Sequence, residues 1–132
     1  MKSRDSLIRL KRFHAEEKRR RVAQIELMIA EFGRMAKELD DQVVAEQERS
    51  GIRDAGHFAY PTLAKAAVQR RDNLQASVNE LKEQLEVAKA ECEAAIEDLQ
   101  KQEAIAERDQ ANEQHPRRGA ADASRGATAA AR

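Results

Sequence analysis

Residues 22–43 read VAQIELMIAEFGRMAKELDDQV and contain a regular apolar pattern. Its apolar side chains recur at alternating spacings of three and four residues, at Val22, Ile25, Ile29, Phe32, Ala36, Leu39 and Val43. This is the a/d heptad pattern of a helix that packs lengthwise against another helix. The pattern therefore predicts a long amphipathic helix, which we place at residues 4–48.

A second seam with the same alternation follows, at Leu74, Val78, Leu81, Leu85, Ala88, Cys92, Ala95 and Leu99. It predicts a second helix at residues 61–110. Val87, Ile96 and Ile105 lie beside this seam and widen its apolar stripe. A wider stripe can accept more than one partner helix.

Residues 49–60 separate the two seams and are predicted to form a turn. Gly51 suits the end of the first helix, where a positive φ is favoured, and Pro61 suits the first turn of the second helix. A linker this short cannot travel the length of either helix, so the second helix must return antiparallel to the first. The fold class predicted for residues 1–110 is all-α, a long antiparallel two-helix coiled coil.

The register of this hairpin can be read from the two seams. If the numbers of facing residues sum to 110, Ile29 faces Leu81 and the midpoint, residue 55, falls inside the turn. The expected coiled-coil core is Val22, Ile25, Ile29, Phe32, Leu39, Val43, Leu74, Val78, Leu81, Leu85, Cys92 and Leu99. Two facing layers are imperfect, namely Leu39 with Arg71 and Lys18 with Cys92.

The composition also argues against an enzyme with an enclosed pocket. Charged residues make up 36% of the chain and aromatic residues only 3%, with no tryptophan. Such a chain lacks the large apolar side chains that a compact core needs, and a high share of Ala, Glu, Lys, Leu and Arg is typical of long helices. We find no candidate catalytic residue and expect no cofactor and no metal site. Residues 111–132 show no apolar period and are expected to form a disordered, basic and alanine-rich tail.

Charge is distributed unevenly along the chain. Residues 1–21, here called the basic segment, contain nine basic and three acidic residues, a net charge of +6. Residues 22–110 contain eleven basic and nineteen acidic residues, a net charge of −8. The antiparallel register lays the basic segment beside residues 80–109, where ten acidic and four basic residues give −6. Opposite charges in facing blocks favour this register more than they add stability.

The sequence also bears on the compartment. Cys92 is the single cysteine, so no disulfide can form within the chain, and a reducing compartment is the simpler interpretation. Basic residues interrupt the apolar stretch near the N-terminus, and no window approaches the roughly 20 apolar residues that span a bilayer. We therefore expect a soluble, intracellular protein.

Two of the four aromatic residues, Phe58 and Tyr60, lie in the turn just before Pro61. Such a pair either packs within the turn and holds it closed, or anchors a partner protein, because aromatic residues are preferred at binding hot spots. The sequence leaves both interpretations open.

Several stretches resemble the flagellar export protein FliJ family in its alphaproteobacterial form. They are MKSRDSLIRLKRF at residues 1–13, EEKRRRVAQIE at 16–26, HFAYPT at 57–62 and RRDNL at 70–74. The resemblance covers about residues 1–108, and its specific part is the opening together with the turn motif. The family's fold is an antiparallel two-helix coiled coil, in agreement with the periodicity.

The resemblance implies a cytoplasmic, non-enzymatic component of the flagellar type III export apparatus, similar to the γ stalk of rotary ATPases. Such a protein inserts into the hexameric export ATPase, contacts the cytoplasmic domain of the membrane export gate and escorts export chaperones. By analogy it nominates Arg9, Arg12, Arg19, Arg20 and Arg21 for the ATPase ring. For the export gate it nominates Phe58, Tyr60 and Leu63.

Two other functions remain open at the level of sequence. A generic coiled-coil adaptor or chaperone would bind client helices along the wide stripe of the second helix. A nucleic-acid or membrane-surface binder would use the basic segment, whose run Lys18 to Arg21 lacks the interleaved aromatic residues common in nucleic-acid binding. Salt distinguishes this last function, because phosphate binding weakens steeply as salt rises.

Overall fold

The computed structural model describes residues 2–114 of the chain. It contains two helices, α1 (Lys2–Ser50) and α2 (Thr62–Gln114), and no strand in that range. The predicted all-α class is confirmed. Both helices are longer than the sequence predicts, with 49 residues in α1 and 53 in α2.

All four expected helix boundaries need correction, and α1 already includes Lys2 instead of beginning at residue 4. Residues 111–114, expected in the tail, belong to α2, because no proline or glycine interrupts the sequence before Pro116. The remainder of the expected tail lies outside the described residues. Ser50 still belongs to α1, and Gly51 directly after it has a φ of 73°. Pro61 precedes α2 instead of lying in its first turn, and its carbonyl oxygen accepts the Lys65 N–H at 3.1 Å.

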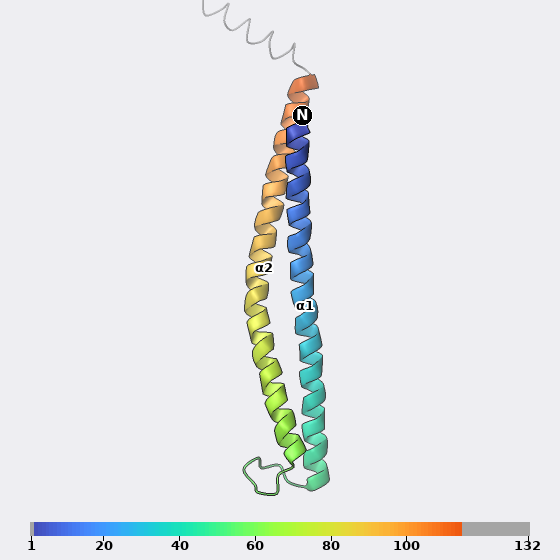
Figure 1. Cartoon of the computed structure of the whole chain (residues 1–132), viewed down its shortest axis with the longest axis vertical. Coiled ribbons are helices and arrows are strands. Elements are labelled where there is room, and N and C mark those ends of the chain that lie inside the picture. The colour runs from blue at the N-terminus through green and yellow to red at the C-terminus, as the bar shows by residue number, and fades with distance from the viewer. Residues whose placement is uncertain (1, 115–132) are drawn as a thin grey trace, which may run out of the picture. The chain divides into compact units, whose positions relative to one another are not determined.

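The chain divides by its packing into two units, which are described separately. Unit 1 pairs residues 2–16 with residues 93–114, and unit 2 comprises residues 17–92. In unit 2, α1 and α2 lie side by side, run in opposite directions and are joined by the loop at one end (Figure 1). Unit 2 is therefore the antiparallel helical hairpin that the two seams predict.

The core of unit 2 lies along the facing seams. Ile25 is only 1% exposed and forms a buried cluster with Leu81 and Ala88. Partly buried side chains pack against this cluster, namely Val22, Ile29, Phe32 and Leu85. These residues all belong to the seams, and they meet in the arrangement expected if facing numbers sum to about 110. Alanines occupy several buried layers, which lets the helices approach closely, at Ala36, Ala64, Ala67 and Ala88.

The remaining expected core residues lie on the same facing side. Val43 is buried, and Leu39, Leu74, Val78 and Cys92 are half-buried. Leu99, which belongs to unit 1, is half-buried as well. Half-burial along a seam is the expected result for two helices alone, because only one side of each is covered.

The two imperfect layers each recruit an acidic side chain of the opposite helix. Arg71 Nη1 lies 2.7 Å from Asp40 Oδ1, and Lys18 Nζ lies 3.0 Å from Glu91 Oε2. The hydrogen bond to Asp40, followed by that to Asp72, raises the pKa of Arg71 above its ordinary value. Each cationic head group thus lies at the edge of the seam, where it reaches solvent and a carboxylate together.

Unit 1 is held by the same combination of small apolar contacts and ion pairs. Ala15 is buried, and the adjacent cations of α1 reach acidic residues of α2. The ion pairs are Arg4–Asp109 at 3.1 Å, Lys11–Asp98 at 2.6 Å and Arg12–Glu103 at 3.9 Å. They join basic residues of the N-terminal stretch to acidic residues near the C-terminal end of α2, as the charge distribution predicts.

The register can be tested with one engineered disulfide. In a Cys92→Ala background, Ile29→Cys with Leu81→Cys is expected to form a disulfide within one chain on mild oxidation, because both residues belong to one packed cluster. Non-reducing electrophoresis and mass spectrometry measure this product. Ile29→Cys with Leu74→Cys is the matched control, displaced by about 10 Å along the helix, and should remain reduced. Equal oxidation of both pairs would contradict the register.

The imperfect layer at Arg71 gives a stability prediction. Arg71→Leu is expected to raise the free energy of unfolding by about 1 kcal/mol, because a partly exposed ion pair contributes little and a leucine there extends the apolar seam. Arg70→Leu, at the exposed neighbouring position, is the control and should change stability by less than about 0.5 kcal/mol. Urea unfolding followed by circular dichroism measures both. A loss of stability in Arg71→Leu would show that the ion pair itself stabilises the hairpin.

Candidate functional site

The loop between the helices, residues 51–61, is held by its own hydrogen bonds. The N–H of Gly51 donates to the Gln47 carbonyl at 2.8 Å, and its φ of 73° turns the chain away from α1. Asp54 Oδ1 accepts the Gly56 N–H at 2.9 Å, a side-chain turn that glycine accommodates easily. The first bond ends α1, and the second stabilises the turn in which the chain reverses its direction.

A second set of bonds closes the loop towards α2. The His57 N–H donates to the Asp54 carbonyl at 3.0 Å, and the Tyr60 N–H donates to the His57 carbonyl at 3.1 Å. His57 Nδ1 also accepts the Ala59 N–H at 3.0 Å. Several backbone N–H groups thus find partners within the loop, which favours one loop conformation.

Tyr60 holds this loop against α1. It is 6% exposed, and its hydroxyl oxygen accepts a hydrogen bond from Gln47 Nε2 at 3.0 Å. A buried side chain with a satisfied hydroxyl is part of the hairpin's own packing. The expectation that Tyr60 contacts the export gate therefore does not fit its position, and this residue takes the structural role that the sequence left open.

Phe58, two residues before Tyr60, has its side chain in solvent instead of in the packing of the hairpin. It is 97% exposed, and its ring stacks on that of His57 with the ring centroids 4.7 Å apart. A fully exposed phenylalanine forgoes about 1.5–3 kcal/mol of burial free energy. Leu63, in the first turn of α2, is also exposed. These two nominated residues present apolar surface near the loop, which we call the loop tip (Phe58 with Leu63).

The five nominated arginines are all exposed but do not belong to one unit. Arg9 and Arg12 lie in unit 1, where Arg12 Nη2 is 3.9 Å from Glu103 Oε2 and its side chain stays mostly open to solvent. Arg19, Arg20 and Arg21 lie in unit 2. All five arginines therefore reach solvent on the surfaces of their own units.

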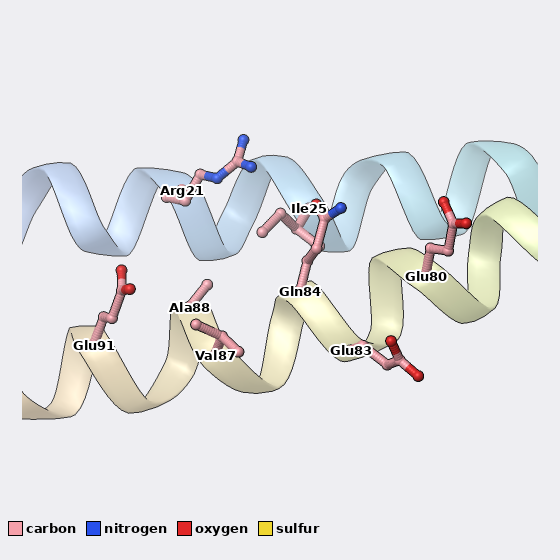
Figure 2. Close-up of a pocket in the computed structure, with 8 residues that line it drawn as sticks. All are labelled: Arg21, Ile25, Glu80, Glu83, Gln84, Val87, Ala88 and Glu91. Atoms are coloured by element: carbon pink, nitrogen blue, oxygen red, sulfur yellow. The ribbon is translucent and has the colours of Figure 1, made fainter.

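Arg21 borders an open groove of about 530 Å³ on one side of unit 2. Figure 2 shows it on α1, with Gln84, Val87 and Glu91 on the facing stretch of α2 and Ile25 between the helices. The seam pattern does not show this groove, although it places Val87 beside the seam in the widened apolar stripe, and Val87 is 59% exposed. Its heptad position, one residue before the seam residue Ala88, is the signal that could have placed it at the rim.

Residues 2–114 contain no group of three or more His, Cys, Asp or Glu side chains that could hold a metal ion. Cys92 is half-buried and has a free thiol. In the part of the chain that is described, neither helix has a stretch both long and apolar enough to cross a membrane.

Comparison with models of known protein families, with curated proteins and with solved structures gives no match for this chain. The resemblance to the FliJ family therefore depends on the stretches of sequence quoted above.

The two aromatic residues of the loop should respond differently to substitution. Tyr60→Phe is expected to lower the free energy of unfolding by about 0.5–1.5 kcal/mol, because the Gln47 amide loses its partner. Phe58→Ala should leave it within about 0.5 kcal/mol, since the ring is in solvent. Chemical denaturation measures both variants. A larger cost for Phe58→Ala than for Tyr60→Phe would reverse these assignments.

Proposed function

We propose that this chain is a FliJ-like component of the bacterial flagellar type III export apparatus. It acts without a catalytic site, cofactor or metal, as a coupling and assembly factor for protein export and hence for flagellum biogenesis, motility and chemotaxis. The observation that carries the proposal is Phe58, a fully exposed aromatic side chain on a loop that is ordered by its own hydrogen bonds. A pre-ordered loop binds with a smaller entropic cost than a flexible one, so it suits an anchor for a partner.

The loop tip is the proposed contact with the cytoplasmic domain of the export gate. Phe58 and Leu63 together offer apolar area on a surface that is otherwise polar and charged. Hot-spot residues at interfaces are commonly large aromatic side chains that fill a pocket of the partner. Tyr60 contributes to this contact by holding the loop and does not meet the partner itself.

The arginines are the proposed contact with the hexameric export ATPase. Arg9 and Arg12 in unit 1, and Arg19, Arg20 and Arg21 in unit 2, would meet acidic surface of the ring. Arginine suits such contacts because its planar guanidinium can form two parallel hydrogen bonds with one carboxylate. The chain would also escort export chaperones. We place it in the cytoplasm, peripherally associated with the inner face of the cell membrane at the flagellar base, with no nucleic-acid partner.

Sedimentation with the flagellar export ATPase tests the proposal. The chain is mixed with the purified ATPase and nucleotide at two salt concentrations, and ring-sized species are expected to carry less than one copy of the chain per ATPase subunit. Replacing Arg19, Arg20 and Arg21 by glutamine should reduce this co-sedimentation. If the chain sediments as the same small species with and without the ATPase, the proposal is contradicted, and the adaptor function is favoured instead.

The gate contact needs its own experiment. Phe58→Ala is expected to weaken binding to the isolated cytoplasmic domain of the export gate by about tenfold or more, which corresponds to about 1.4 kcal/mol. Isothermal titration calorimetry measures the affinity. Phe13→Ala is the matched control, because this phenylalanine is also exposed but lies in unit 1. Equal weakening by both variants would argue against the loop tip as the anchor.

A further inference from the structure

One long side of unit 2 carries two open grooves, which we call together the flank groove. The first, of about 530 Å³, lies beside Arg21 and Val87 (Figure 2), and the second, of about 450 Å³, lies beside Met35 and Arg70. On α1, Arg21 and Met35 are two heptads apart, and on α2, Arg70 and Gln84 are two heptads apart. Residues at whole heptads from one another share a helix face, so both grooves lie along the same side of the hairpin.

The floor and walls of the flank groove expose apolar surface. Ile25 lines its floor in the first part, and Leu39 and Leu74 line the second. Met35 is 44% exposed and Val87 59% exposed at the walls. Positions beside the seam of a two-stranded coiled coil usually carry charged side chains that pair across it. On this side of α1 the two such positions between Arg21 and Gln42 carry Met28 and Met35, and methionine adapts well to a varied partner surface.

Charge at the rim indicates the chemistry of the partner. The residues lining the two grooves include four glutamates and two arginines, with the excess of negative charge around Val87. Glu91 is paired with Lys18, whereas Glu80 and Glu83 form no ion pair with any residue of the described range. Two copies of the chain docked groove to groove would bring like charges together, which disfavours a second copy as the occupant.

We propose that the flank groove binds one amphipathic α-helix of another protein, with apolar residues against Met35 and Val87 and lysines or arginines facing Glu80 and Glu83. The groove follows α1 from residue 21 to residue 42, so it accepts a helix of about 20 residues, roughly 30 Å long. Such a helix completes a three-helix seam over the half-buried side of the hairpin. This surface excludes Phe58 and the arginines of unit 1 but includes Arg21, which the proposed ATPase contact also uses. The inference itself does not depend on the flagellar assignment.

Binding of a designed peptide to the full chain tests the inference. The probe is a fluorescent helical peptide of about 20 residues, with leucine on one face and lysine on both flanks. Fluorescence anisotropy is expected to show binding at physiological salt. A second peptide with glutamate in place of lysine should bind at least about tenfold more weakly, because it meets the acidic rim.

Two double variants locate the peptide. Met35→Gln with Val87→Gln should weaken the lysine peptide by about tenfold or more, since both side chains wall the groove. Leu27→Gln with Val44→Gln is the matched control, because these side chains are similarly exposed but do not line the groove, and binding should be retained. All four positions are exposed, and circular dichroism should show unchanged helicity.

Three results would overturn the inference. The lysine peptide could still bind the Met35→Gln, Val87→Gln variant, or the Leu27→Gln, Val44→Gln variant could weaken binding equally. The third such result is equal affinity for the lysine and glutamate peptides. Sedimentation of the chain alone tests whether a second copy of the chain occupies the groove. A dimer that is lost in Met35→Gln with Val87→Gln would show that a second copy occupies the groove instead of a foreign helix.

Discussion

The structure of unit 2 depends on the lengthwise contact between its two heptad seams, centred on Ile25 against Leu81 and Ala88. This contact fixes which residues of α1 and α2 face each other, because each apolar side chain has one matching position across the seam. It also closes the loop, since the ends of the helices must then lie near each other. Phe58 is consequently presented from a defined loop, and the flank groove remains where two helices leave a third side uncovered.

The pairing of the two helices was largely predictable, because heptad periodicity indicates which side chains of a helix are buried. The spacing around Ile25 and Leu81 places both in the core, and the net charges of the facing blocks support the same register. Even the imperfect layer at Arg71 was visible in the sequence. The ion pair that Arg71 forms with Asp40 was not visible, because Asp40 lies one position outside the seam. Only the path of the arginine side chain in the structure brings Arg71 Nη1 within 2.7 Å of Asp40 Oδ1.

The features that escaped prediction depend on local geometry. Nothing in the order Phe58, Ala59, Tyr60 says which ring is buried, and the answer rests on the Gln47 amide lying within 3.0 Å of the tyrosine hydroxyl. Likewise, how much of Val87 stays exposed beside the seam depends on how far the facing helix covers it. Both cases concern positions outside the regular a/d seam, where heptad spacing does not say which side chain is buried.

The antiparallel pairing of α1 with α2 in unit 2 can be measured by the distances between spin labels attached to the two helices. In a Cys92→Ala background, labels are attached at exposed positions, Ala23→Cys with Glu86→Cys in one sample and Ala23→Cys with Gln69→Cys in another. Double electron–electron resonance should give a narrow distribution for the first pair, shorter by about 10 Å or more than for the second, because the second pair is offset along the helix axis. Equal distances, or a shorter second distance, would contradict the hairpin and with it the assignments of the loop tip and the flank groove.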